Sequence, residues 1–356
     1  MNITFLIGNG FDLNMELKTR YSDFYSEYIN IHSENPAIRQ FKKDISSDIK
    51  TWADFELEFG KYIEKYNAKN KNDIIVCRDD FLEEFIYYLR RQEQQINYKN
   101  LENEIIEKFK NSLRGFHEKL SPESQQIFIN LYSNYSQERT YYHFISFNYT
   151  NILDNCIDLI RNAPVPKMQT SNQKIIAAND IRDIIHIHGT VDEDTILGVD
   201  NSTQIFNDEL AKDKTFTRLV LKPEINKKLR NRKIESVISI LNASTVICVF
   251  GMSIGETDKT WWQYLGKWLL NDKHHLVFFD VIDKYNKIHT SQTIRSVDKI
   301  INHFYNMADF PDDKRDLCES RIHIGFNTGL FKVDLTRSMD DTEKVELIEE
   351  KELLTV

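Results

Sequence analysis

Short apolar runs that alternate with longer helical stretches are the feature that most constrains how this chain can fold. The runs lie at residues 3–7, 142–147, 184–187, 195–199, 245–250, 276–281 and 321–326. Because they lack the polar alternation of half-exposed strands, we expect them to be buried on both faces, as in parallel sheets covered by helices. The pattern predicts an α/β fold with a doubly wound, mostly parallel sheet.

A long segment in the first half of the chain is predicted to be helical almost throughout. Apolar side chains recur there every three to four residues, as in Phe81 and Phe85, and glycine is rare. Ser121 followed by Pro122 is typical of a helix start. We predict an α/β domain made of residues 1–34 and 141–335, a helical insertion at 35–140, and an acidic tail or helix at 336–356.

The charge balance argues against nucleic acid as the main partner. Lysine and arginine number 46 and aspartate and glutamate 55, so the net charge is −9 and little is gained by releasing phosphate counterions. The basic segment 222–233 is interpreted as a solvated helical face, with a local RNA-binding patch as the alternative.

The chain shows no sign of a membrane or of disulfides. No apolar stretch approaches the ~18 residues of a membrane span and no signal peptide is recognisable, so we expect no membrane contact and a cytoplasmic location. The four cysteines form no CxxC pair. We interpret them as small buried hydrophobic residues in a reducing compartment.

Four polar segments follow predicted strands, and the first is glycine-rich. Gly8, Asn9, Gly10 and Asp12 come directly after the first strand. Glycine allows positive φ and a close approach of backbone amides to a phosphate, although a plain strand-to-helix turn explains the glycines equally well. Leu13 stands where the GxGxxG fingerprint needs its third glycine, which argues against an ordinary NAD-dependent dehydrogenase.

The second and third segments contain an asparagine and two histidines. The amide of Asn148 could hold a ribose or a water, or else Asn148 or Asn151 caps the following helix. His186 and His188 are separated by one residue, which places both on one face of a strand. A metal pair, a general base and structural packing all remain open for them.

The fourth segment contains Gly251, which would admit a ligand, and Ser253, which could hydrogen-bond a sugar hydroxyl. Trp261 and Trp262 in the next helix are interpreted as core anchors, and residues 52–56 as the start of an amphipathic helix. Because ligands bind at the carboxyl ends of parallel strands, we expect the four segments to form one site.

Six motifs occur in a specific order across residues 5–258: GNGFD, RYSDF, WADFE, SFNYTN, IHIHG with ILGV, and GMSIGETD. Together they resemble the phage abortive-infection AbiH family along most of the chain. AbiH proteins are antiphage defence factors of bacteria, so the resemblance implies a defence role. It does not by itself imply a reaction.

A more distant resemblance, to sirtuins and to the sirtuin-like NADases of defence systems, implies a reaction. Those proteins have a glycine-rich opening turn, an asparagine motif, a later His-Gly pair and a glycine-serine motif, and this chain has counterparts in the same order. The resemblance implies NAD as substrate and no metal, with Asn148 orienting the nicotinamide ribose and the attacking water, and His188 as general base. It assigns nucleotide binding to Gly8, Asn9, Gly10, Asp12, Gly251 and Ser253.

Two departures from the sirtuin pattern matter. The isolated cysteines cannot form the four-cysteine zinc module of sirtuin deacetylases, so peptide deacetylation is not expected. Thr150 stands where an acid often follows the asparagine motif, and Asp12 is the candidate replacement. The role of His186 stays open.

The leading hypothesis is an antiphage protein that hydrolyses the nicotinamide–ribose bond of NAD. One alternative is a nucleotide-binding sensor that triggers a partner without catalysis. Another is a nuclease whose metal would be held by His186, His188, Asp12 and Asp258. The expected partners are a nucleotide substrate and a phage-derived trigger, and a homo-oligomer is left open.

Overall fold

A computed structural model describes residues 1–162, 180–229, 232–282 and 290–338. Within these residues one six-stranded sheet has the order β3-β2-β1-β4-β5-β6, and every neighbouring pair is parallel. The strands are β1 (Asn2–Ile7), β2 (Tyr141–Ser146), β3 (Ile181–His186), β4 (Val246–Phe250), β5 (His275–Asp280) and β6 (Ile322–Phe326). The predicted doubly wound parallel sheet is confirmed, and its strand order reverses between β1 and β4.

One predicted strand, at residues 195–199, is wrong. This segment makes only an isolated parallel bridge, between Val199 and Leu221, and is not part of the sheet. Leu197 and Val199 are buried instead in a core that is built mainly from helices. The apolar run therefore indicates burial, which a loop covered by helices produces as readily as a strand does.

Helices account for most of the remaining described structure. They are α1 (Gly10–Asn14), α2 (Tyr21–Tyr28), α3 (Pro36–Ser47), α4 (Phe55–Tyr62), α5 (Lys71–Gln94), α6 (Tyr98–Gly115), α7 (Pro122–Asn134), α8 (Ile152–Asn162), α9 (Asp208–Lys212), α10 (Lys214–Val220), α11 (Lys222–Leu229), α12 (Lys233–Ala243), α13 (Lys259–Leu269), α14 (Thr290–Met307) and α15 (Arg315–Glu319). A short 3-10 turn, η6 (Glu256–Asp258), precedes α13.

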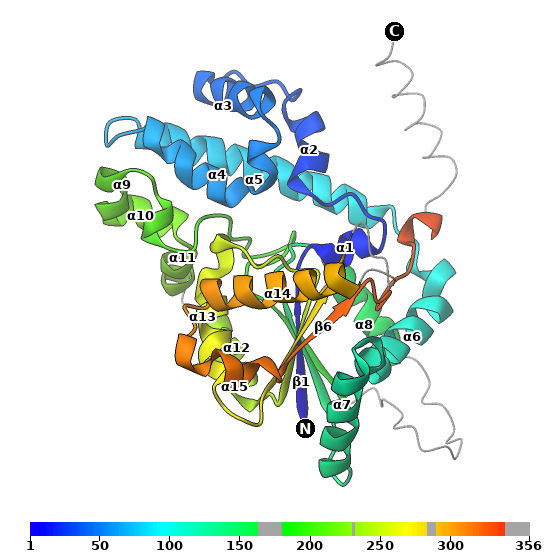
Figure 1. Cartoon of the computed structure of the whole chain (residues 1–356). Coiled ribbons are helices and arrows are strands. Elements are labelled where there is room, and N and C mark those ends of the chain that lie inside the picture. Colours follow the sequence, from blue (N-terminus) through cyan, green and yellow to red (C-terminus); the bar gives the residue numbers. More distant parts are fainter. Residues whose placement is uncertain (163–179, 230–231, 283–289, 339–356) are drawn as a thin grey trace.

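Helices cover both faces of the sheet (Figure 1). Phe5 of β1 shares the core of one face with Phe109 of α6. Leu6, the next residue, points to the opposite face and shares its core with Trp262 of α13 and Phe304 of α14. Successive side chains of the strand are thus buried on opposite sides, which explains why the strands read as continuous apolar runs.

Helices α2 to α5 form a layer beyond the carboxyl end of β1, next to α1 (Figure 1). We call α2 to α5 the helical layer. Aromatic rings fill its core, and those of Phe55 and Phe81 stack with centroids 3.7 Å apart. Helices α6 and α7, which belong to the same predicted insertion, instead cover a face of the sheet. The division into domains stays a prediction, and residues 339–356 of the predicted tail lie outside the described residues.

Several local predictions are confirmed. The Ser121 hydroxyl caps α7 by accepting a hydrogen bond from the Ser124 amide at 3.3 Å, and Pro122 is the first residue of the helix. Trp261 and Trp262 are buried in the core. All four cysteines are buried and none forms a disulfide.

Candidate functional site

A pocket of about 920 Å³ lies at the carboxyl ends of β1 and β4, where the strand order reverses. Doubly wound sheets bind their ligands at this position. Its lining includes Gly8, Asn9, Gly10, Asp12, Asn148, His188, Gly251 and Ser253. The structure therefore brings together all the residues that the sequence analysis assigned to catalysis or nucleotide binding.

The glycines at this position allow the two loops after β1 and β4 to touch. A Cβ atom on Gly10 would lie 2.6 Å from the Gly251 Cα, and Gly251 itself has a φ of +66°. The amides of Gly8 and Gly10 donate to the carbonyl oxygens of Phe250 (3.0 Å) and Gly251 (2.7 Å). Because these two amides are engaged within the protein, close backbone packing accounts for the glycines, as the turn interpretation expects.

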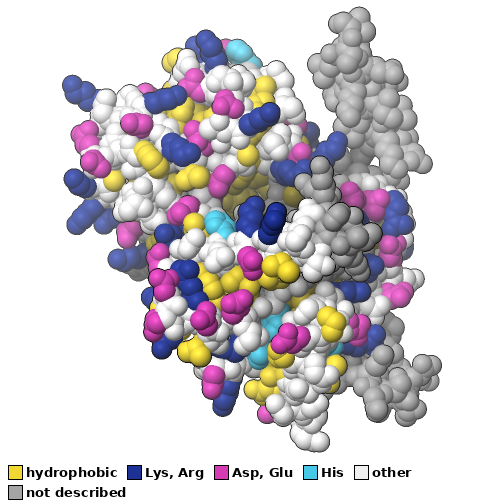
Figure 2. Space-filling view, viewed as in Figure 1, with side chains coloured by type: hydrophobic (Ala, Val, Ile, Leu, Met, Phe, Trp, Pro, Cys, Tyr) yellow, Lys and Arg dark blue, Asp and Glu magenta, His cyan; other side chains and the backbone are white. Residues whose placement is uncertain are grey.

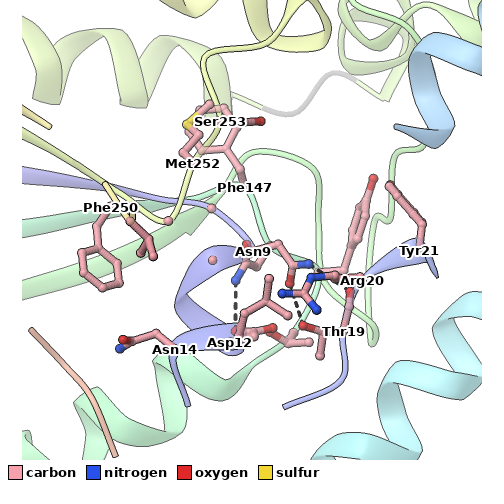
Figure 3. A pocket seen from close by; sticks show the side chains of 18 of the residues that line it. Asn9, Asp12, Asn14, Thr19, Arg20, Tyr21, Phe147, Phe250, Met252 and Ser253 are labelled. Carbon is pink, nitrogen blue, oxygen red and sulfur yellow. Dashed lines mark hydrogen bonds between the residues drawn. The ribbon is translucent and has the colours of Figure 1, made fainter. Parts of the chain in front are cut away.

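Asn9 and Ser253 present different groups to the pocket. Figure 3 shows Ser253 across the pocket from Asp12 and Thr19. The Asn9 amide is engaged with Thr19, accepting from its hydroxyl at 2.7 Å and donating to its carbonyl oxygen at 3.0 Å. The side chain of Ser253 is exposed. Ser253 is therefore better placed than Asn9 to bind the hydroxyl groups of a ligand.

Asp12 connects the first segment to the second. Its Oδ1 accepts a hydrogen bond from Asn148 Nδ2 at 3.0 Å, and its Oδ2 accepts one from Thr150 Oγ1 at 2.7 Å. The side chain is only 1% exposed, and this burial raises the pKa of Asp12 to about 7. Asp12 thus supplies a carboxyl group beside Thr150 that can hold or release a proton near neutral pH.

His188 lines the same pocket and packs against two aromatic rings. Its ring packs against Phe147 and Tyr149, with centroids 5.6 and 6.4 Å away. Burial, with a contribution from the nearby Lys222, lowers the pKa of His188 well below its ordinary value. The imidazole is therefore neutral at physiological pH, and Asp258 Oδ1 lies 3.9 Å from its Nε2.

His186 and His188 line different pockets, so the structure does not bring them together at one site. Strand β3 ends at His186, and the chain then turns, so the period of two no longer applies. His186 lines a second pocket, where its Nε2 lies 2.8 Å from Asp154 Oδ2 and its Nδ1 lies 3.1 Å from the carbonyl oxygen of Asn148. Its contact with the carbonyl oxygen helps to hold the Asn148 backbone in place.

Lys222 and Glu56 are functional candidates that the sequence analysis missed. Lys222 opens the basic segment interpreted as solvated, yet it is only 4% exposed, and its Nζ lies 2.5 Å from Glu56 Oε2. The solvated interpretation is wrong for Lys222 but holds for the exposed Lys227 and Lys228. Glu56 does follow a helix start, because Asp54 caps α4. Glu56 ends the WADFE motif of the family resemblance, but its local pattern did not indicate that its carboxylate would line the pocket.

The arrangement of the residues gives no support to the nuclease alternative. In the part of the chain that the structure describes, no group of three or more His, Cys, Asp or Glu side chains is placed to hold a metal ion. Figure 2 shows basic and acidic side chains interspersed over one face of the molecule, without a basic stripe.

None of the described helices combines the length and the apolar character that a membrane span needs.

The fold and the site define a doubly wound α/β protein with a ligand pocket at the reversal of strand order. The family model for bacteriophage abortive infection AbiH matches residues 4–280, and the chain belongs to this family. Its role is therefore in phage abortive-infection defence. No curated protein matches the chain significantly.

Proposed function

We propose that this pocket binds NAD and hydrolyses its nicotinamide–ribose bond, with His188 as the general base. The observation that carries the proposal is that His188 and Asn148 line one pocket at the β1/β4 reversal. Sheets with this strand order bind dinucleotides there. The volume of about 920 Å³ falls at the upper end of the usual range for small-molecule sites.

The chemistry suits the groups present. The C1′–N bond breaks and its electron pair leaves with nicotinamide, which is already cationic in NAD and needs no added proton. Water forms the new C1′–O bond and gives a proton to His188, so the products are nicotinamide and ADP-ribose. General base catalysis of this kind contributes roughly 10²- to 10⁴-fold to the rate. Asp258, 3.9 Å from His188 Nε2, would stabilise the imidazolium that forms.

The polar end of the pocket suits a ribose. Asp12 and Asn148 are held together by a hydrogen bond, and Ser253 lies across the pocket from Asp12 (Figure 3). Phe147 and Tyr149 beside His188 are largely buried and give the reacting end apolar walls. In such surroundings, fixed dipoles stabilise a developing oxocarbenium charge better than bulk water does.

Nicotinamide release from NAD by the purified protein tests the proposal. We expect turnover in the wild type, alone or after addition of lysate from phage-infected cells, and a loss of about 10²-fold or more in His188→Ala. His32→Ala, at a site whose side chain is 79% exposed, is the matched control and should keep full activity. No release under either condition, or equal rates in wild type and His188→Ala, would refute the hydrolase.

A nucleotide sensor without turnover is the second candidate. The hydrogen-bonded set of Asp12, Asn148 and Thr150 favours it, because this set can bind a ribose without any catalytic step. A sensor predicts that NAD raises the Tm without nicotinamide release, and that Asn148→Ala abolishes this increase. The phage-derived trigger and any homo-oligomer stay proposals under both functions.

A further inference from the structure

Lys222 is a buried cation whose neighbours come from separate parts of the chain. Its Nζ lies 2.5 Å from Glu56 Oε2 of α4 and 3.8 Å from Asp258 Oδ1 of η6, and it donates to the Thr257 carbonyl oxygen at 3.4 Å. Its side chain is 5% exposed, and that of Glu56 9%. A buried charge is tolerated only when it is paired and hydrogen-bonded, and this one has both kinds of contact.

Asp258 lies between this cation and the proposed base. The same oxygen, Oδ1, is 3.8 Å from Lys222 Nζ and 3.9 Å from His188 Nε2. At these distances the carboxylate attracts either group when it is charged. The position of Asp258 therefore depends on whether Lys222 is present. The strength of the electrostatic interaction between Asp258 and the imidazole depends on it too.

We propose that Lys222 is a positioning residue for His188, because it holds Asp258 beside the imidazole and, through Glu56, ties that arrangement to the helical layer. The inference rests on the proposed function for the role of His188 as general base. Its test does not depend on that function. The pair between Glu56 and Lys222 spans 166 residues and joins α4 of the helical layer to α11. A displacement of α4 would thus reach the proposed base through two buried contacts.

The surroundings of His188 set the sign of the expected effect. Asp258 faces it from η6, Lys222 approaches from α11, Glu56 lies behind Lys222 on α4, and the Tyr149 ring packs on it. Although burial alone would lower the pKa of Lys222, the carboxylates of Glu56 and Asp258 raise it, so the lysine stays charged. Its charge lowers the pKa of His188, beyond the larger effect of burial.

Removing the lysine charge should therefore raise the pKa of His188 for two reasons. The imidazolium would lose a repulsive neighbour, and Asp258 would lose the cation that shares its charge. In Lys222→Met we expect the pKa of His188 to rise by about 1 to 3, the usual effect of an unshared carboxylate nearby. In Asp258→Asn we expect the opposite sign, a fall in the pKa of His188, because the imidazolium loses its neighbouring carboxylate.

The test is an NMR titration of histidine-labelled full-length protein, with the His188 signal assigned by its loss in His188→Gln. Lys228→Met, at an exposed lysine of the same helix, is the matched control and should leave the His188 titration unchanged. An unchanged His188 pKa in Lys222→Met, or a rise in both Lys222→Met and Asp258→Asn, would overturn the inference.

A second variant keeps the test decisive if Lys222→Met fails to fold. Lys222→Met combined with Glu56→Gln removes both charges of the buried pair and should still raise the pKa of His188. Where turnover is measurable, the acidic limb of the kcat/KM profile should move to higher pH in both variants. If NAD is not hydrolysed but the titration shifts as expected, the proposed function fails and this inference stands.

Discussion

Asp12 is a buried carboxyl group held by two side chains that follow β2, Asn148 and Thr150. Its pKa of about 7 in the folded protein lies above the ordinary value of 3.8, because burial favours the neutral form. The folded state therefore binds more protons than the unfolded chain between these values. Stability contributed by this group is present at low pH and is lost as pH rises from about 4 to about 7.

We predict that Asp12→Asn changes the pH dependence of stability as well as its size. At pH 5 the variant should be less stable than wild type by about 1 to 3 kcal/mol, because it disturbs two buried hydrogen bonds. At pH 8 the difference in the free energy of unfolding between wild type and variant should be smaller. The wild type then buries the charge of Asp12, whereas the variant buries none. Urea unfolding at both values measures this, with the fully exposed Asp183→Asn as control. A difference that does not vary with pH would contradict the prediction.

Single residues also show which parts of the candidate site could be predicted from the sequence. Asn148, His188 and Ser253 were found because each directly follows an apolar strand, and strand ends of a parallel sheet converge. Glu56 and Lys222 were missed because their burial arises from a contact between residues 166 apart. Neither local period nor composition carries information about such a pair, and a lysine in a basic run resembles a solvated one.

At the scale of elements, the contact between the β1–α1 turn and the loop after β4 shapes the pocket. Gly251 has a φ of +66°, and a Cβ there would lie 2.5 Å from the Phe11 amide nitrogen. Gly255, four residues later in the same loop, has ordinary van der Waals space, with its nearest atoms 3.7 and 3.8 Å away. The two positions therefore offer a matched pair of substitutions.

We predict that Gly251→Ala destabilises the protein by about 1 to 3 kcal/mol, because the methyl group meets backbone that cannot yield and alanine disfavours positive φ. Gly255→Ala should cost about 0.5 kcal/mol or less. Chemical denaturation measures both, and under the proposed function nucleotide protection against thermal unfolding should be lost only in Gly251→Ala. Equal destabilisation by the two substitutions would show that this contact does not shape the pocket.

Strands were predicted correctly where the apolar pattern of the sequence follows from burial between helices on both faces of the sheet. The runs that became β1 and β4 are buried on both faces by helices, so an unbroken apolar sequence indicated them correctly. The run at residues 195–199 misled because Leu197 and Val199 are buried by the helical layer and not by a sheet. Burial sets hydrophobicity in both cases, and only the tertiary arrangement distinguishes them.

At the scale of the whole molecule, the two ends of the sheet oppose each other in pH dependence. The pocket end contains Asp12, whose pKa burial raises to about 7. The other end contains His275, at the start of β5, and His323 of β6, whose pKa values burial lowers to about 4 and about 3. Rising pH therefore weakens one end and falling pH the other, and the two effects oppose each other where their pH ranges overlap, between about pH 4 and pH 6.5.

His323 gives the most direct test of the acid side. It is 2% exposed, its Nδ1 lies 2.8 Å from Ser124 Oγ of α7, and its Nε2 lies 3.1 Å from His275 Nδ1. In the unfolded chain His323 binds a proton below its ordinary pKa of 6.5. In the folded state it stays neutral until the pH falls to about 3. Its contribution is thus present above pH 6.5 and is lost, by about 1.4 kcal/mol per pH unit, as pH falls.

We predict that His323→Gln flattens the acid limb of the stability curve. Glutamine retains a group that can bond to Ser124 but takes up no proton, so the variant should lose less stability than wild type between pH 6.5 and pH 4. Urea unfolding across this range measures both slopes, with the exposed His32→Gln as control. Parallel slopes in wild type and His323→Gln would mean that the acid sensitivity of the molecule arises elsewhere. They would also mean that His323, at the other end of the sheet, does not offset the pH dependence that the buried Asp12 gives to the pocket end.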